Sequence, residues 1–246
     1  MGVKTWNFQE GAVLYFNKPL HWTSFDLVNK VRYKISRALN VKKIKVGHAG
    51  TLDPLATGVM IICTGKATKR IDEFQYQTKE YVATLALGAT TPSFDLETEI
   101  DQRYETAHIT RELVEQTLPQ FLGSIEQIPP AYSAVKVNGD RAYTLARKGE
   151  EVVLQAKTLV IDEIELLDFQ EVAGQARNDK LSEDGAKTMK IRVVCSKGTY
   201  IRALARDIGV ALHSGAHLTG LERTRIGDVT LSQCIEIDEF VIDGLK

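Results

Sequence analysis

The feature that most constrains this chain is a glycine-containing loop between its most basic stretch and an apolar run. The loop reads GHAGTLDPLATG from Gly47 to Gly58, and VMIIC follows at residues 59–63. Glycine adopts backbone angles that other residues avoid and lets a ligand approach closely. Asp53 precedes Pro54, and a residue before proline is driven toward extended angles. The pattern predicts a loop that holds the carboxylate of Asp53 between glycines, just before a buried strand.

Charge is distributed unevenly along the chain. The formal net charge of -1 taken alone argues against a nucleic-acid partner, because neutralising phosphates requires many basic residues on one surface. However, no acid occurs between Leu27 and Leu52, where the basic residues are Lys30, Arg32, Lys34, Arg37, Lys42, Lys43 and Lys45. The compensating acids gather between positions 95 and 115. Such asymmetry is what a soluble protein with one polyanion-facing surface needs.

Composition excludes several classes of protein. With 246 residues and 43% apolar content, the chain can bury a substantial core and is not disordered as a whole. Cys63, Cys195 and Cys234 show no C-x-x-C spacing and are too few for a disulfide framework, which favours a reducing cytoplasm. No apolar run approaches the ~20 residues of a transmembrane helix, and no signal peptide is recognisable. We therefore expect a cytoplasmic protein with no membrane partner.

Periodicity predicts alternating short strands and helices. Strands are expected at 13–16, 59–63 and 81–87, and a helix capped by Thr23 or Ser24 has an apolar face of Val28, Val31, Ile35 and Leu39. Thr110 opens another helix, which Pro119 shortens or kinks.

The second half of the chain reads as hairpins. Asn138-Gly139 predicts a hairpin turn before a short helix with Arg141 and Arg147. Strands are then expected near 151–155 and 159–167, a long mobile loop at 170–188, a strand at 189–196, a turn at Lys197-Gly198 and a helix at 200–212. No repeat or regular βαβ alternation occurs, so the fold class is α+β with a mixed, largely antiparallel sheet.

Several motifs that carry chemistry are absent. Gly65-Lys66 lacks the Ser/Thr and the first glycine of a phosphate-binding P-loop. There is no G-x-G-x-x-G after a strand and no G-x-S-x-G. His213 and His217 lack an H-E-x-x-H pattern, so no metal site is predicted. An isolated Asp-Pro is most often a turn, but Asp53 follows the basic stretch, and the ring of His48 offers a stacking surface for a base.

The loop from Gly47 to Gly58 resembles a motif of the TruB family of tRNA pseudouridine synthases. That family carries a pattern close to G-H-x-G-x-L-D-P-x-A-x-G, and this sequence matches it at each fixed position from Gly47 to Gly58. Further matches are Asn17-Lys18-Pro19, TGKAT at 64–68, Lys79-Glu80-Tyr81, PAYSA at 130–134 and SKGTYIR at 196–202. The resemblance spans residues 12–240. It implies isomerisation of uridine 55 in the tRNA T-loop, without metal or cofactor.

The resemblance also implies roles for residues. Asp53 would be the catalytic carboxylate, and it would either attack the sugar or assist removal of a sugar proton; both routes require it ionised. Arg202 would keep it charged, since a guanidinium is a permanent bidentate partner for a carboxylate. Tyr81 would pack on the target base and take part in proton transfer from C5. Tyr200 would form a second aromatic wall. For each tyrosine, an aromatic side chain in the face of a strand is the ordinary alternative.

Binding the T-stem-loop of tRNA requires the target base to be flipped out. His48 would fill the vacated stack. Phosphate contacts are expected from the basic residues Lys18, Lys42, Lys43, Lys45, Arg141 and Arg147. Residues 121–150 would fold over the RNA as a thumb. For each lysine taken singly, a solvated surface charge is the ordinary alternative.

The expected organisation is a single catalytic domain over residues 1–246. Many family members carry an additional RNA-binding domain of the PUA type, which is not expected here because few residues follow Gly227. We therefore expect a monomer that acts without a guide RNA or an obligatory protein partner. Two alternatives remain: an RNA-binding or RNA-folding protein that keeps the fold without the chemistry, and a pseudouridine synthase that acts on another RNA.

Overall fold

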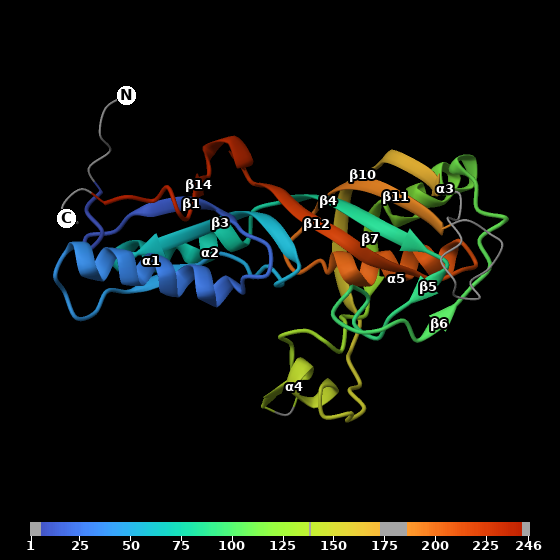
Figure 1. Cartoon of the computed structure of the whole chain (residues 1–246), viewed down its shortest axis with the longest axis horizontal. Coiled ribbons are helices and arrows are strands. Elements are labelled where there is room, and N and C mark those ends of the chain that lie inside the picture. Colours follow the sequence, from blue (N-terminus) through green and yellow to red (C-terminus); the bar gives the residue numbers. More distant parts are fainter. Residues whose placement is uncertain (1–5, 138, 173–185, 243–246) are drawn as a thin grey trace. The chain divides into compact units, whose positions relative to one another are not determined.

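Two compact units make up the computed structural model, which describes residues 6–137, 139–172 and 186–242. Unit 1 comprises Met1–Tyr81 and Glu222–Lys246, and unit 2 comprises Val82–Leu221. Two strands, β4 (Lys79–Leu87) and β12 (Ala216–Ile226), begin in one unit and end in the other (Figure 1). The prediction of a single catalytic domain stays a prediction.

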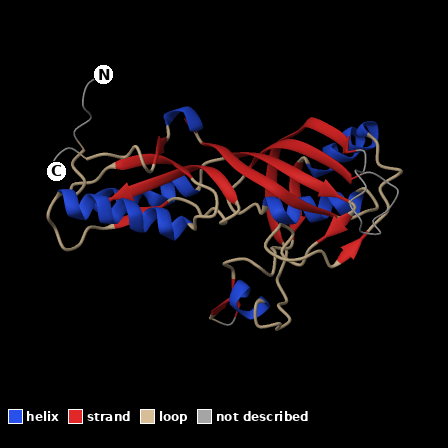
Figure 2. Ribbon diagram, viewed as in Figure 1, coloured by secondary structure: helices blue, strands red, loops and turns tan. Residues whose placement is uncertain are grey.

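Unit 1 contains a sheet together with the α-helices α1 and α2 (Figure 2). Its strand order is β14-β1-β3-β12, with β2 added to β3 and β13 added to β12. Strand β1 runs antiparallel to β3 and parallel to β14. The elements are β1 (Val13–Lys18), α1 (Ser24–Ala38), β2 (Val46–His48), β3 (Ala56–Thr64), a 3-10 helix (Gly65–Arg70), α2 (Ile71–Gln75), β13 (Val229–Thr230), a 3-10 helix (Leu231–Gln233) and β14 (Ile235–Glu236).

Helix α1 begins where its capping residues predict. The side chain of Thr23 accepts from the amide of Asp26, and the Asp26 carboxylate accepts from the amide of Thr23, which forms a capping box. The predicted apolar face is buried at Val28, Val31 and Ile35, whereas Leu39 is 39% exposed because the helix ends before it.

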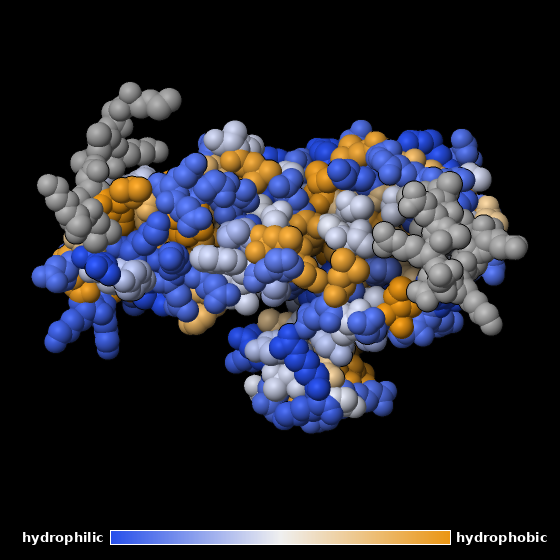
Figure 3. Space-filling view, viewed as in Figure 1, coloured by the Kyte–Doolittle hydropathy of each residue, from blue (hydrophilic) through white to orange (hydrophobic). Residues whose placement is uncertain are grey.

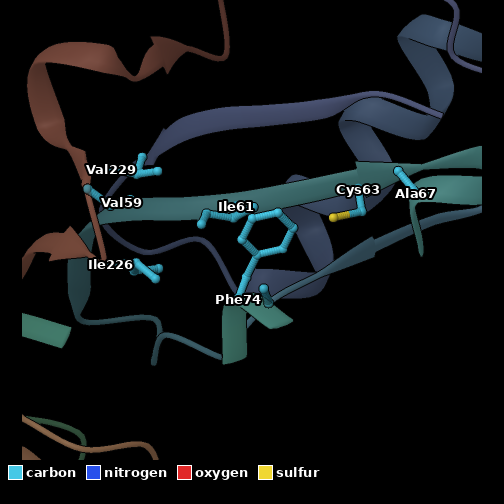
Figure 4. Packing of buried hydrophobic residues seen from close by; sticks show 8 residues of the cluster. Val59, Ile61, Cys63, Ala67, Phe74, Ile226 and Val229 are labelled. Carbon is cyan, nitrogen blue, oxygen red and sulfur yellow. The ribbon is translucent and has the colours of Figure 1, made fainter. Parts of the chain in front are cut away.

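A cluster of buried apolar side chains holds β3 in the core of unit 1 (Figure 4). Strand β3 contributes Val59, Ile61 and Cys63, and Phe74 of α2 packs on them. Ala49, in the loop before β3, is also fully buried in this cluster. The residue just after His48 is therefore fixed by the core.

Unit 2 is built on a sheet. Its strand order is β12-β4-β11-β10-β7, and β10 runs antiparallel to both β11 and β7. The elements are β5 (Ala89–Thr90), β6 (Gln102–Arg103), α3 (Arg111–Thr117), a 3-10 helix (Leu118–Phe121), β7 (Gly123–Gln127), β8 (Lys136–Val137), β9 (Asp140–Arg141), α4 (Ala142–Ala146), β10 (Lys157–Val172), β11 (Ala186–Cys195) and α5 (Ile201–Ala211). The predicted α+β class with a mixed, largely antiparallel sheet is confirmed.

The predicted hairpin forms a lobe with α4 inside unit 2. Lys136 pairs with Arg141 and Val137 with Asp140, so the turn falls where Asn138-Gly139 predicts it; Asn138 itself lies outside the described residues. In Figure 1 this lobe stands apart from the strands of unit 2, and Figure 3 shows a mainly hydrophilic surface on it.

Two predictions about the second half of the chain need correction. Residues 151–155 form no strand and pair with no other strand of the described part of the chain, and Val153 is 80% exposed. The two ends of the predicted loop 170–188 belong to strands instead, since β10 continues to Val172 and β11 begins at Ala186. Residues 173–185 lie outside the described residues. No helix of the described part is long and apolar enough to cross a membrane.

Candidate active site

The loop between β2 and β3 carries Asp53 and is anchored on both sides of it. Before Asp53, the amide of Leu52 donates to Oγ of Ser24 (2.8 Å), and that hydroxyl donates to the carbonyl of Leu52 (2.9 Å). After it, the amide of His21 donates to the carbonyl of Pro54 (2.8 Å). Asp53 itself is half-buried. The backbone around the carboxylate is therefore fixed. A group that must meet its substrate in one orientation requires such a fixed backbone.

Two glycines of the loop have conformations that other residues avoid. Gly50 has φ +104° and Gly58 has φ +110°. A Cβ on Gly58 would lie 2.2 Å from the carbonyl oxygen of Arg223, which is closer than real atoms approach. Glycine is therefore required at position 58 for two reasons: its φ is positive, and the backbone of β12 at Arg223 leaves no room for a Cβ.

Lys18 lies beneath the loop rather than on the surface. Its side chain is fully buried, and Nζ donates to the carbonyls of Pro19 (2.8 Å) and Trp22 (2.6 Å). Burial lowers the pKa of Lys18 to about 8; Asp53 opposes this shift, Arg223 adds to it and Asp26 opposes it. The predicted phosphate contact of Lys18 stays a prediction. Its burial and its electrostatic interaction with Asp53 favour a role inside the fold, as a cation near that carboxylate.

His48 ends β2 with its ring half-buried. Its Nδ1 is buried and has no hydrogen-bond partner among the described residues. Burial lowers the pKa of His48, the backbone of Gly50 opposes the shift and Arg223 adds to it. The ring is therefore neutral at pH 7, the form that can stack on a base without bringing a charge into the stack.

Arg223 on β12 is a residue of this region that the sequence did not reveal. Only 1% of it is exposed, and its guanidinium donates to the carbonyls of Val59 (2.8 Å), Gly50 (3.1 Å) and Thr51 (3.4 Å). Sequence patterns for helices, strands and metal sites carry no signal for an arginine whose partners are backbone carbonyls.

Tyr81 lies on the buried face of β4, where burial alternates along the strand. Its neighbour Glu80 accepts from the hydroxyl of Thr224 (2.8 Å) and from Arg225 (3.2 Å), which joins the start of β4 to the end of β12 within unit 1. This fixes the strand that carries the tyrosine. The predicted contact of Tyr81 with a base stays a prediction.

Arg202 and Tyr200 belong to unit 2, at the start of α5. Arg202 is buried and forms an ion pair with Asp95 (Nε to Oδ2, 3.6 Å), and it donates to the carbonyls of Ser93 (3.2 Å) and Tyr132 (2.8 Å). Tyr200 is half-buried, and its backbone is held by both side-chain groups of Gln127. The pairing of Arg202 with Asp53 stays a prediction.

The other predicted phosphate-binding residues are exposed. Lys42, Lys43 and Lys45 lie in unit 1 between α1 and β2. Arg141 and Arg147 flank α4 in unit 2; Arg141 donates to the carbonyl of Ala134 (2.6 Å), and Arg147 pairs with Glu97. That carboxylate raises the pKa of Arg147. Phosphate binding by Arg147 would therefore require exchange of one anionic partner for another.

An open hollow of 530 Å³ adjoins the loop in unit 1. It is lined by His21, Trp22, Asp26, Asn29 and Lys30, and the amide of His21 is the donor to Pro54. Among the described residues, no group of three or more His, Cys, Asp or Glu side chains could hold a metal ion. The absence of a metal from the reaction stays a prediction.

Comparisons with known proteins agree on one family. The model of the TruB family pseudouridylate synthase N-terminal domain matches residues 36–201. A tRNA pseudouridine synthase B from Phocaeicola vulgatus is 70% identical over 95% of this chain and 93% of its own length. The enzyme of the same name from Deinococcus radiodurans is 41% identical over 92% of this chain and 77% of its own length.

Solved structures give the same fold. A chain in a Cbf5-Nop10-Gar1 complex superposes with a TM-score of 0.64 at 29% identity, over 94% of this chain. The matched region is 54% of that chain, so this protein spans about half of its length. A chain in an H/ACA RNP bound to a substrate RNA superposes with a TM-score of 0.61 at 26% identity.

Proposed function

This chain belongs to the TruB family of pseudouridylate synthases, and from this we infer that it isomerises uridine to pseudouridine in tRNA, at position 55 of the T-loop. The reaction breaks the C1′–N1 bond, rotates the uracil and joins C1′ to C5, which loses its proton while N1 gains one. Substrate and product have the same atoms, so no co-reactant is required. The observation that carries the proposal is the anchored loop that presents Asp53 within the matched family motif.

Asp53 is the proposed catalytic carboxylate. It attacks C1′ or assists removal of a sugar proton, and an ionised oxygen is needed on either route. Asp53 is within electrostatic range of the ammonium of Lys18, and a nearby cation favours the ionised form of a carboxylate. A single carboxylate suffices, because the departing base stays bound and is used again.

We assign Tyr81 to contact with the flipped base and to proton transfer from C5, and Tyr200 to a second wall of the base site. Arg202 is assigned to pairing with Asp53 in the RNA complex. The neutral ring of His48 fills the stack that the target base leaves. The exposed lysines of residues 42–45 and the lobe around α4 contact phosphates. The protein acts as a monomer in the cytoplasm without an obligatory protein partner.

Unmodified tRNA transcripts test the proposal directly. Incubation with the protein should produce pseudouridine at position 55 only, which chemical mapping of the product RNA locates. A modified site in another RNA region, with none at position 55, would assign a different substrate. Tight RNA binding without any pseudouridine would leave an RNA-binding protein.

The first prediction concerns Asp53→Asn. It should abolish turnover and leave tRNA affinity within a few-fold, because the amide lacks the ionised oxygen but keeps the shape of the side chain. Single-turnover kinetics and equilibrium binding measure the two effects. Asp72→Asn, an exposed acid on α2, is the matched control and should behave as the wild type. Substantial turnover by Asp53→Asn, after deamidation to aspartate is excluded, would remove Asp53 from catalysis.

A further inference from the structure

Arg223 is a buried cation without a carboxylate partner among the described residues. Its hydrogen bonds to described residues all go to backbone carbonyls. Burying an ionised group is costly unless it is paired and hydrogen-bonded, and an apolar side chain would fill the same space at lower cost. Packing alone therefore does not explain a buried arginine at this position. The positions of the carbonyls that its guanidinium contacts suggest another role.

Those carbonyls lie on both sides of Asp53. The two terminal nitrogens of the guanidinium donate to the carbonyls of Gly50 and Thr51, which precede the carboxylate, and Nε donates to the carbonyl of Val59, which follows it. The guanidinium is planar and its donors have a fixed geometry, so the two ends of the loop are held at a fixed separation. The backbone of Arg223 also packs against Gly58.

We propose that Arg223 is a positioning residue that braces the two ends of the Asp53 loop, so that the carboxylate is in its reactive orientation before RNA binds. This inference rests on the proposed function of Asp53. The brace acts together with Ser24 and His21, which fix Leu52 and Pro54 next to the carboxylate. Arg223 does not touch the reacting atoms and acts through the loop alone.

The field of Arg223 supports this assignment. It contributes to the lowered pKa of both Lys18 and His48, so its charge acts on two other groups of this site. A brace of this kind affects the rate of the chemical step more than the affinity for RNA, because phosphate contacts elsewhere supply most of the binding free energy.

The test compares Arg223→Lys and Arg223→Gln with the wild type. Lysine keeps the charge but cannot span three carbonyls, and glutamine keeps one donor group without charge. Displacement of a catalytic group by an ångström can cost about 100-fold in rate, so each variant should lose about that much single-turnover rate per folded molecule. Its affinity for tRNA should stay within a few-fold. Circular dichroism gives the folded fraction.

Arg111→Lys is the control. Arg111 is exposed on α3 in unit 2 and pairs with Glu115, so its variant should keep the wild-type rate. A normal rate per folded Arg223→Lys molecule would show that the arginine only stabilises the fold and would overturn the brace. A wild-type protein without turnover on tRNA would instead overturn the proposed function.

Hydrogen exchange of the wild-type protein does not depend on whether the variants fold. The brace predicts that the amides of residues 52 and 56, which are hydrogen-bonded within this region, exchange as slowly as those of β3 in the absence of RNA. Exchange on the timescale of an open loop would show that the region is not fixed before RNA binds and would overturn the proposal.

Discussion

Lys18 places a positive charge inside unit 1. As pH rises, loss of this charge should increase stability and decrease activity. Its folded pKa of about 8 is below the ordinary value of 10.5, so between these values the unfolded chain binds more protons than the folded one. The free energy of unfolding contributed by Lys18 therefore rises with pH across that window. Over the same window the ammonium, and with it the charge near Asp53, is lost.

The second prediction follows from this opposition. The single-turnover rate of the wild type should fall as pH rises through about 8 without loss of folded protein. Lys18→Met keeps the apolar stem and removes the charge, so it should be slower at pH 7 and should lack this alkaline limb. Rate and melting temperature measured from pH 6 to about pH 10, near the ordinary lysine value, check both effects. An identical limb in Lys18→Met would assign it to another group.

Arg202 carries two roles that can be separated. It holds the buried carboxylate of Asp95 in unit 2, and we assign it to Asp53 in the RNA complex. Removing one partner of a buried ion pair typically costs about 3–5 kcal/mol, because the remaining charge stays buried. Loss of activity in a single variant is thus ambiguous.

The third prediction uses a double variant to remove that ambiguity. Arg202→Met should lower the melting temperature and the single-turnover rate. Arg202→Met with Asp95→Asn removes both buried charges and should recover stability, but the rate per folded molecule should stay low. Asp95→Asn alone should keep most of the rate. Recovery of the rate together with stability in the double variant would mean that Arg202 serves only Asp95.

At the scale of elements, β12 and the Asp53 loop depend on each other through Gly58. The fourth prediction is that Gly58→Ala destabilises the protein more than Gly123→Ala does. Both glycines have positive φ, but a Cβ on Gly123 would meet nothing within 4 Å, whereas one on Gly58 would meet the backbone of Arg223. Backbone strain typically costs about 1–3 kcal/mol in each, and only Gly58→Ala adds the clash. Denaturant unfolding measures the difference, and equal losses would exclude the clash.

The elements that the sequence predicted are those whose signals are local. The cap at Thr23 is found, Val137 pairs with Asp140 across the predicted hairpin, and the helix expected at 200–212 is found as α5. Residues 151–155 show the limit, because alternation predicts a strand only when a neighbour is there to pair with. Strand β12 was missed for the opposite reason: its sequence is polar, and its pairing depends on residues far away in the chain.

The site shows the same division. The loop, its glycines and the position of Asp53 could be read from the sequence because they lie within one motif. The burial of Lys18 and the contacts of Arg223 could not, since both depend on partners brought together by folding. Lysine and arginine are mostly exposed in proteins, so composition alone predicts a surface position for each.

For the whole molecule, the distribution of charge matters more than its sum. The net charge of -1 gives no attraction for a polyanion, yet Lys42, Lys43 and Lys45 are exposed in a segment without acids. Each phosphate contact to a basic residue releases counterions, so the logarithm of affinity falls with the logarithm of salt concentration. The slope of that line counts contacts and is insensitive to the net charge.

The fifth prediction is that replacing Lys42, Lys43 and Lys45 together by alanine weakens tRNA binding and flattens this slope. Each lost contact should reduce the slope by about one unit, or by somewhat less on a single strand. Alanine at Lys66, Lys157 and Lys190, which are also exposed, changes the net charge equally and is the control. Affinity measured over a range of salt concentrations separates the two variants. If Lys42, Lys43 and Lys45 form a localised binding surface, the slope changes only in their triple variant. Equal changes in both variants would indicate a general effect of charge, and no change would show that these lysines bind no phosphate.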